Sequence, residues 1–285
     1  WTALTTVNIG SGVTSIDYLC SDCSNLISVS IPSSVTSIGN SAFRSCSSLK
    51  SITIPSSVTS IGNSAFGGCS SLSSITIPSS VTNIGDFAFS GCSSFSSITI
   101  PNNVTSIGQS AFSDCNKLTT VNFNAINCTK MGLITSAYYY PVFSSCSAFT
   151  TLNIGDAVQN IPEAAFYQCS NITSVTIGNN IRSIGTYAFR YCSALTTVDF
   201  NAINCTTVGT RIFYDCNSLT TLNIGDAIQS IPSSIFNDCS KVTTVNFNAV
   251  NCTSANSPFS KCSLTKLSIG KVVLTIPATA FAGCS

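Results

Sequence analysis

The chain has 285 residues, of which only 7% are charged, and 11 Lys and Arg residues balance 10 Asp and Glu residues to a net charge of +1. Without a basic cluster there is little electrostatic attraction to nucleic acid or to an anionic membrane, so we expect neither as a partner. Hydrophobic residues make up 44% of the chain, which is enough for a continuous core. No apolar run approaches the roughly 20 residues that a membrane-spanning helix needs.

One repeated phrase organises the whole chain. Residues 49–71 read LKSITIPSSVTSIGNSAFGGCSS, and nearly the same phrase begins again at Leu72, which sets a period of 23 residues. Equivalent starts fall at twelve positions: Leu4, Leu26, Leu49, Leu72, Phe95, Leu118, Phe149, Ile172, Leu195, Leu219, Val242 and Leu264. We therefore expect a single domain over residues 1–285, with about twelve repeats of 22–24 residues and one longer repeat at 118–148.

Each repeat opens with a short predicted strand. The pattern L-x-x-I-x-I places apolar side chains on one face, and the same strand of the next repeat can pair beside it in parallel. Repetition of this unit predicts one long parallel β-sheet. Pro32, Pro55, Pro78 and Pro101 directly follow the strand, where the missing backbone donor ends the pairing and fixes a bend.

A second apolar segment follows the bend, as in Val58, Ile61 and then Gly62. Ala65 and Phe66 come next, and we interpret them as a short helical or 3-10 turn on the wall opposite the sheet. These elements together predict a repeat solenoid, because a single repeat would leave both of its faces open. The phenylalanine fills the space between the walls, and its equivalents predict an internal aromatic stack. These equivalents are Phe43, Phe89, Phe112, Phe143, Phe166, Phe189, Phe213, Phe236, Phe259 and Phe281, with Cys20 in the first repeat.

The tandem phrase I-P-x-x-V-x-x-I-G-x-x-A-F-x-x-C-x-x-L resembles the BspA-type leucine-rich repeat, and the resemblance covers the full length of the chain. The matching residues of the third repeat are Ile54, Pro55, Val58, Ile61, Gly62, Ala65, Phe66, Cys69 and, opening the next repeat, Leu72. The resemblance implies a curved leucine-rich-repeat fold on secreted or cell-surface proteins of bacteria and some protozoa. It also implies adhesion to host matrix proteins or other cells. The N-terminus lacks the features of a signal peptide, so we expect any targeting segment to have been removed.

The sixteen cysteines raise the question of disulfide bonds or a metal site. Twelve of them share one repeat position, which favours packing as small buried side chains, and we expect reduced thiols. A few disulfides between neighbouring repeats stay open as an alternative. Cys128, Cys205 and Cys252 belong to a variant phrase, NAINCT, and are expected to point inward as well. Zinc is disfavoured because the chain has no His and its one C-x-x-C, at Cys20 and Cys23, has no second copy.

Catalysis is also disfavoured by the residue types present. Without His, the usual activation of Ser or Cys by an adjacent base is missing. The carboxylates are scattered among repeat loops with no pair suited to acid–base chemistry, and each is better explained as a turn residue or a solubilising charge. We expect no enzyme activity and no cofactor.

The outward positions of the predicted strands form two polar rows, which are the candidate binding face. These residues are Ser51, Thr53, Ser74, Thr76, Ser97, Thr99, Thr120, Asn122, Ser174, Thr176, Thr197, Asp199, Thr221, Asn223, Thr244 and Asn246. Such a face suits an extended protein partner or a glycan. The alternative is that Thr is simply a good exposed strand residue. Rows of Thr are also found in ice-binding solenoids, but these rows are broken by Ser, Asn and Asp.

The sixth repeat contains an insertion. The spacing from Cys115 to Cys146 is 31 residues, and the extra segment includes Tyr138, Tyr139 and Tyr140. Exposed tyrosines are favoured in contact surfaces because they combine a large ring with a polar tip. The other interpretation, slightly preferred, is that this loop folds back over the edge of neighbouring repeats.

These observations predict a noncatalytic, monomeric protein that recognises a macromolecule outside the cell, such as a matrix protein, a cell-surface protein or a glycan. A spacer that displays another domain is the competing hypothesis, and ice binding is a minor one.

Overall fold

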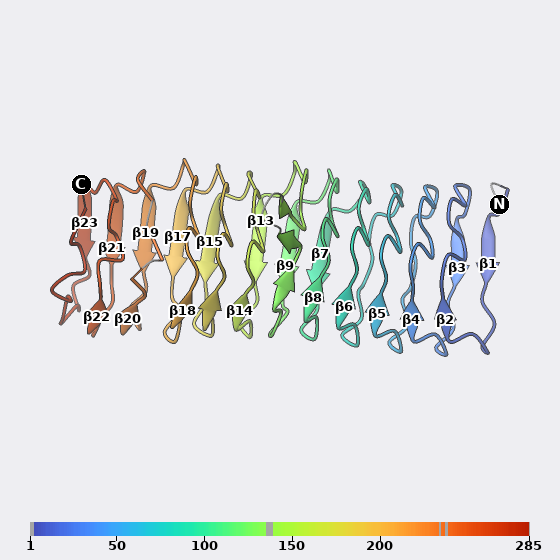
Figure 1. Cartoon of the computed structure of the whole chain (residues 1–285), viewed down its shortest axis with the longest axis horizontal. Coiled ribbons are helices and arrows are strands. Elements are labelled where there is room, and N and C mark those ends of the chain that lie inside the picture. The colour runs from blue at the N-terminus through green and yellow to red at the C-terminus, as the bar shows by residue number, and fades with distance from the viewer. Residues whose placement is uncertain (1–2, 135–138, 234, 237–238, 285) are drawn as a thin grey trace. The chain divides into compact units, whose positions relative to one another are not determined.

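The computed structural model describes residues 3–134, 139–233, 235–236 and 239–284 (Figure 1). The chain divides into two compact units. Unit 1 is Trp1–Phe149 and unit 2 is Thr150–Ser285. Each unit is a parallel β-solenoid, and the two contain about eleven turns in all. The expected repeat solenoid is thus confirmed, whereas its expected curvature and its treatment as one domain stay predictions.

Unit 1 has two walls of strands. The strands that open each coil form the sheet wall, and shorter strands midway along each coil form the second wall. The sheet-wall strands are β1 (Thr6–Asn8), β3 (Ser28–Ser30), β7 (Ser97–Ile100) and β9 (Thr120–Phe123). The second-wall strands are β2 (Ser15–Ile16), β4 (Ser37–Ile38), β5 (Ser60–Ile61), β6 (Asn83–Ile84), β8 (Ser106–Ile107) and β10 (Lys130–Met131). The second wall is one six-stranded sheet in the order β10-β8-β6-β5-β4-β2, which the sequence pattern did not predict.

Unit 2 repeats this arrangement with a more regular sheet wall. Its sheet-wall strands are β13 (Thr151–Ile154), β15 (Ser174–Ile177), β17 (Thr197–Phe200), β19 (Thr221–Ile224), β21 (Thr244–Phe247) and β23 (Lys266–Ile269). Its second-wall strands are β14 (Asn160–Ile161), β16 (Ser183–Ile184), β18 (Thr207–Val208), β20 (Ser230–Ile231) and β22 (Ser254–Ala255). The strands β15, β17, β19, β21 and β23 pair in parallel in that order and form a five-stranded sheet.

The sheet wall of unit 1 is interrupted, so the expected single long sheet is wrong there. Residues 51–54 and 74–77, which were expected to be strands, have no strand conformation. Where a coil lacks proline, the residue after the strand donates its N–H to the preceding coil, as Asn124 N does to Ile100 O at 3.0 Å. Pro78 has no N–H to donate to the coil that contains residues 51–54. Proline therefore shortens the ladder between coils as well as ending the strand.

The second wall explains the glycine that follows five of its six strands in unit 1, all except β2, which is followed by Asp17. A Cβ on Gly62 would lie 2.5 Å from the carbonyl carbon of Gly39 in the preceding coil. Backbone atoms cannot move aside as a flexible side chain can, so this position admits only glycine at the observed coil spacing. The small residue thus sets how closely successive coils approach.

The third side of each coil, here called the turn wall, runs from two residues before the stacked phenylalanine to three residues after it. No helix occurs among the described residues, so the expected helical or 3-10 turns are wrong. Around Phe66, Ser64 has a φ of 53° and Gly68 has a φ of 76°. Two left-handed residues four positions apart leave no room for a right-handed helical turn. Backbone hydrogen bonds to the next coil hold the turn wall instead, as from Phe66 N to Ala88 O at 2.8 Å.

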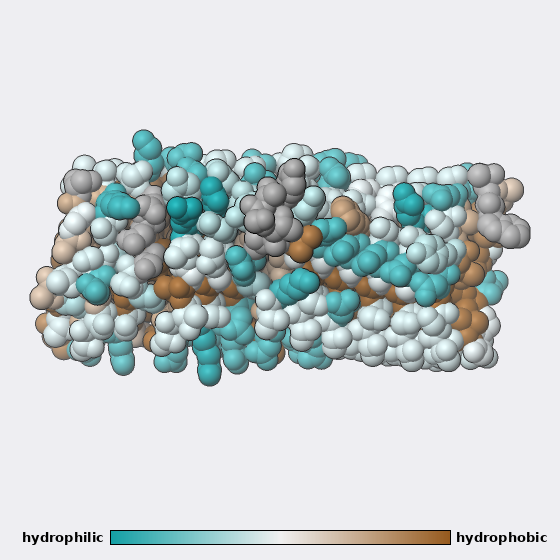
Figure 2. Space-filling model, viewed as in Figure 1, coloured by the Kyte–Doolittle hydropathy of each residue, from teal (hydrophilic) through white to brown (hydrophobic). Residues whose placement is uncertain are grey.

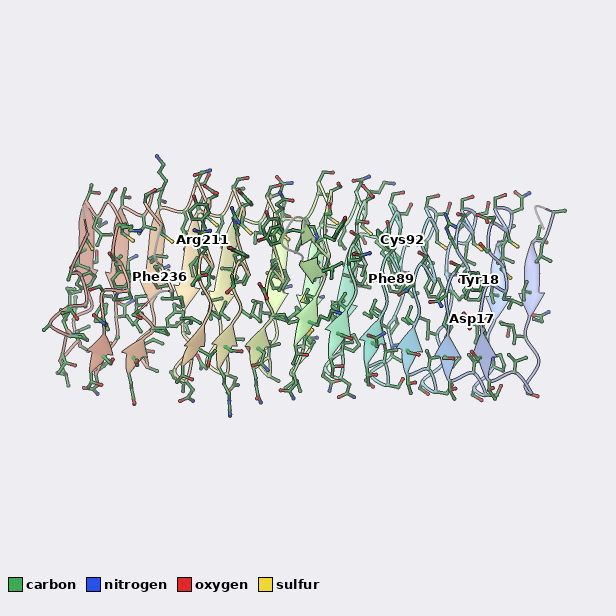
Figure 3. All side chains as sticks on the ribbon, viewed as in Figure 1. Asp17, Tyr18, Phe89, Cys92, Arg211 and Phe236 are labelled. Atoms are coloured by element: carbon green, nitrogen blue, oxygen red, sulfur yellow. The ribbon has the colours of Figure 1, made fainter. Side chains whose placement is uncertain are left out.

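The aromatic stack expected from the repeat is confirmed within each unit. In unit 1, Phe89 is fully buried, and its ring centroid lies 5.3 Å from that of Phe66 and 5.1 Å from that of Phe112 (Figure 3). The interplanar angles of these two pairs are 4° and 8°. In unit 2 the same stack runs from Phe166 to Phe281. The coils therefore have a continuous apolar centre.

A cysteine column lies beside the stack, as expected. Cys69 and Cys92 are fully buried, and their Sγ atoms lie 3.1 Å from Phe43 O and 3.3 Å from Phe66 O of the preceding coils. The position thus takes a small apolar side chain that also donates a weak hydrogen bond, which distinguishes Cys from Ala or Val. All sixteen cysteines are free thiols, and burial raises the pKa of Cys20 to about 12.

Candidate recognition surface

Unit 2 carries a row of hydrogen-bonded polar side chains along its sheet wall, here called the polar ladder: Thr176, Asp199, Asn223 and Asn246. Asn246 Nδ2 donates to Asn223 Oδ1 at 2.7 Å, and Asn223 Nδ2 donates to Asp199 Oδ1 at 2.6 Å. Thr176 Oγ1 donates to the other carboxylate oxygen, Asp199 Oδ2, at 3.4 Å. The parallel register places these residues directly beside one another, so each side chain fixes the orientation of the next.

A second row runs along the same sheet. Thr197, Thr221 and Thr244 are in register with one another, Ser174 precedes them and Lys266 follows them. The three threonines are half-buried. The structure therefore places the predicted residues of unit 2 on one continuous face.

The predicted residues of unit 1 are less ordered. Ser97 and Thr99 in β7 are exposed and lie opposite Thr120 and Asn122 in β9, where Asn122 Nδ2 donates to Thr99 Oγ1 at 3.3 Å. The remaining four residues are also exposed but belong to the two coils without a sheet-wall strand: Ser51, Thr53, Ser74 and Thr76. The expected continuous face is thus limited in unit 1 to the β7–β9 pair.

Within the insertion, β11 (Leu133–Ile134) and β12 (Tyr139–Tyr140) pair in antiparallel fashion, which sequence patterns did not predict. Tyr139 is half-buried and Tyr140 is 39% exposed. Tyr138 lies outside the described residues. Of the tyrosines that the structure describes in the predicted contact segment, Tyr140 is exposed to solvent.

Several polar side chains of unit 1 have a structural role. Asn40 Oδ1 accepts a hydrogen bond from Asn63 N at 2.9 Å, and Asn63 Oδ1 accepts one from Asp86 N at 2.8 Å. Asp86 Oδ1 in turn accepts from Gln109 N at 2.9 Å. This spine joins successive coils where the chain leaves the second wall. Asp86 is therefore an acceptor within the fold, which agrees with its interpretation as a turn residue.

The surface has little charge for an interacting protein to use. Most of the molecule in Figure 2 is pale, the intermediate hydropathy expected of a chain rich in Ser and Thr. Within the described ranges, no group of three or more His, Cys, Asp or Glu residues is placed to hold a metal ion. The same part of the chain contains no helix long and apolar enough to cross a membrane.

One cluster was missed by the sequence patterns. Tyr187, Arg190 and Tyr191 lie on the turn wall of one coil in unit 2, and Arg211 and Tyr214 lie on the turn wall of the next. The signal was present in the segment GTYAFRYC, where most other repeats have Ser or Gly beside the Ala-Phe pair. Only an alignment of the repeats by column would have brought the two coils together.

The fold is shared with known bacterial proteins. A leucine-rich repeat protein from Bacteroides ovatus ATCC 8483 is 24% identical, and the match covers 100% of this chain and 86% of that one with a TM-score of 0.52. A leucine-rich cell surface protein from Faecalibacterium prausnitzii A2-165 is also 24% identical, over 93% of this chain and 88% of that one, with a TM-score of 0.44. The first likeness shows the class of fold, which is a leucine-rich-repeat solenoid.

The family follows from the sequence itself. The BspA type leucine-rich repeat region matches residues 14–140 and 159–285, with six copies. The chain therefore belongs to the BspA-type leucine-rich repeat family, and the resemblance carried by the repeated phrase is confirmed. No curated protein matches the chain significantly.

Proposed function

We propose that this protein is a noncatalytic recognition protein, secreted or displayed at the cell surface, that binds a protein or glycan through the sheet wall of unit 2. The observation that carries the proposal is the polar ladder, in which Asp199, Asn223 and Asn246 hold one another in place. The family supports an extracellular location, because the resemblance implies surface proteins.

The ladder is suited to binding because its side chains are ordered before a partner arrives. Asn223 uses one Nδ2 hydrogen and one oxygen lone pair within the ladder, which leaves a second donor and a second acceptor for a ligand. Fixing side chains in advance lowers the entropy lost on association. A row of such amides recognises a partner by hydrogen-bond geometry and needs little net charge.

The interrupted sheet wall of unit 1 argues against the minor alternative of ice binding. Ice requires a regular flat array, whereas Thr53 and Thr76 lie in coils without a sheet-wall strand. A thermal-hysteresis measurement on the whole chain tests this directly, and we expect no hysteresis.

The recognition proposal is tested by screening the whole chain against extracellular proteins and glycans. The test variant combines Asn223→Leu and Asn246→Leu, which keep the size of the side chains but remove their donors and acceptors. The matched control combines Thr59→Leu and Thr82→Leu, exposed positions of the second wall. We expect the ladder variant to lose its strongest signals and the control to keep them.

The unit 1 face is tested separately with Thr53, Thr76 and Thr99 changed together to Lys. Binding signals that survive both sets of sheet-wall substitutions would remove the sheet wall from the proposal. A chain that binds nothing in the screen, although it is folded, would favour the spacer hypothesis instead.

A further inference from the structure

We propose that the turn wall of unit 2 carries a separate binding site for an acidic polysaccharide, one that bears carboxylate or sulfate groups. The site consists of Tyr187, Arg190, Tyr191, Arg211 and Tyr214, here called the Arg–Tyr cluster. It belongs to a different wall from the polar ladder and does not depend on the function proposed for that ladder.

The cluster is built around one guanidinium group. Arg190 Cζ lies 4.5 Å from the ring centroid of Tyr191, 4.9 Å from that of Tyr187 and 5.1 Å from that of Tyr214. Arg190 Nη2 also donates to the Tyr191 hydroxyl at 2.9 Å. Cation–π contacts of this kind orient a guanidinium group without neutralising its charge. The three rings therefore fix a positive group in place.

The positive charge of the cluster is not compensated by carboxylates. Arg190 Nε is buried without a hydrogen-bond partner, and the described residues provide neither Arg190 nor Arg211 with an ion pair. Asp215 lies on the same coil as Arg211 and does not pair with it. Arg211 Cζ lies 5.6 Å from the ring centroid of Tyr214, and its side chain is exposed (Figure 3). Two guanidinium groups with spare donors are a receptor for anionic oxygens.

The backbone conformation of the turn wall does not require bulky residues at these positions. Tyr187, Tyr191 and Arg211 have φ angles of 60°, 62° and 53°, a region that is costly for large side chains. At the positions of Tyr187 and Tyr191, the third coil of unit 1 has Ser64 and Gly68, which adopt the same conformation with smaller side chains. The two tyrosines are half-buried and lie outside the phenylalanine stack, although Tyr191 makes an edge contact with the ring of Tyr167 at 5.5 Å between centroids. Because the same turn forms with Ser and Gly at these positions, the tyrosines are not needed to form it, and their position points to binding.

The turn wall favours a polysaccharide over an extended peptide. Peptides commonly bind along a strand edge through main-chain hydrogen bonds, which need free backbone groups. Here Tyr187 N already donates to Thr210 O at 3.1 Å, and Tyr191 N already donates to Tyr214 O at 3.0 Å. A sugar polymer needs no backbone partner. Its C–H faces can stack on the exposed parts of the tyrosine rings, and its acidic groups can pair with the two guanidinium groups.

The test measures binding of the folded 285-residue chain to four immobilised polymers. Heparin supplies sulfate and carboxylate groups, polygalacturonate supplies carboxylate alone, dextran is neutral and polyglutamate is an acidic peptide. We expect binding to at least one acidic polysaccharide, weakened by added salt because exposed charges are screened. Stronger binding to polyglutamate than to either acidic polysaccharide, or no binding to either, would overturn the proposal.

Two variants and one matched control assign the binding to the cluster. Arg190→Gln and Arg211→Gln are each expected to weaken polysaccharide binding by about tenfold or more. Arg44→Gln is the control, because Arg44 directly follows the stacked Phe43 as Arg190 follows Phe189, but the pocket that Arg44 lines contains one aromatic ring, Phe87, in place of three tyrosines. Arg211 is exposed, so its variant remains informative if Arg190→Gln disturbs the turn wall, as judged by circular dichroism. An equal loss in the Arg44→Gln control would mean that charge alone binds the polymer, and would refute the cluster.

The ladder variant with Asn223→Leu and Asn246→Leu separates this proposal from the recognition proposal. It should bind heparin and polygalacturonate as the unchanged chain does. A parallel loss of polysaccharide binding in that variant would place the binding on the sheet wall and refute the turn-wall site.

Discussion

Removing one ring from the middle of the aromatic stack should cost far more than removing a ring with fewer neighbours. Phe89 is fully buried and stacks on Phe66 at 5.3 Å and on Phe112 at 5.1 Å. Phe89→Ala deletes a buried phenyl group, for which cavity formation and lost transfer energy come to about 3–5 kcal/mol. The two stacked pairs, each worth about 0.5–1.5 kcal/mol beyond the buried area, place the loss in the upper part of that range, at about 4–5 kcal/mol. Urea unfolding followed by circular dichroism gives this free energy difference.

The matched comparison is Phe281→Ala at the same repeat position. Phe281 is partly exposed and stacks on Phe259 alone, at 5.1 Å, with an edge contact from Phe247 at 5.8 Å. We expect a loss of about 2 kcal/mol, since half of the stacking and part of the burial are absent. Equal losses for the two variants, or a loss below about 1 kcal/mol for Phe89→Ala, would show that the stack does not hold the coils together.

Three further outcomes follow from the backbone and the thiols. Gly62→Ala should lower the free energy of unfolding by about 1–3 kcal/mol, because the added Cβ would lie 2.5 Å from the carbonyl carbon of Gly39. Gly12→Ala is the control, because a Cβ there would have no atom within 4 Å, and it should change the free energy of unfolding little in the same urea titration. Ser64→Gly should raise the melting temperature, because relief of a left-handed φ of 53°, about 1–2 kcal/mol, exceeds the entropic cost of glycine, about 0.5–1 kcal/mol. Raised thiol pKa values, such as about 12 for Cys20, keep the folded thiols protonated while unfolded thiols ionise near 9.0. Stability is therefore complete below pH 9 and falls above it, by about 1.4 kcal/mol at pH 10 for each thiol whose pKa is raised as far as that of Cys20. Melting temperatures that stay constant from pH 8 to pH 10.5 under reducing conditions would contradict this.

The confirmed predictions concern residues that recur at the same position of nearly every repeat. Phe66 and Cys69 recur at a fixed spacing, and a fixed spacing in stacked coils forces equivalent side chains into columns. The period alone therefore predicted the solenoid, the aromatic stack and the inward cysteines. No knowledge of the local backbone conformation was needed for those predictions.

The features that were wrong depend on backbone details that hydrophobic patterns do not contain. The segment around Ala65 and Phe66 appeared helical because its apolar residues are adjacent, but Ser64 and Gly68 adopt left-handed conformations on either side. The sheet wall appeared continuous because its strands are alike, but Pro78 removes a hydrogen bond that belongs to the neighbouring coil. A proline in a solenoid must therefore be judged by the pairing of its neighbours as well as by its own strand.

For the candidate sites, the repeat pattern predicted which side chains face outward but not which of them contact one another between coils. The alternation of the strands predicted the outward positions of Asn223 and Asn246, but their mutual hydrogen bonds arise only from the parallel register. The Arg–Tyr cluster could not be predicted along the chain, because Arg190 and Tyr214 lie 24 residues apart and meet only between coils. Distance in sequence conceals such a site unless the repeats are aligned.

The hydrogen bonding of the coils explains where a protein of this kind can acquire specificity. On the turn wall, Phe66 N bonds to Ala88 O of the next coil and Phe189 N bonds to Ile212 O in the same way, whatever side chains lie outside. The coil is thus held by its backbone, its aromatic centre and its thiols, which leaves the outward columns free to vary at little structural cost. Unit 1 has mainly Ser and Gly beside its stack, whereas three neighbouring coils of unit 2 have Tyr or Arg there: Tyr167, Tyr187, Arg190, Tyr191, Arg211 and Tyr214. Tyr187 and Ser64 share a left-handed φ, so the difference between these coils lies in their side chains, and we propose that a binding partner detects it.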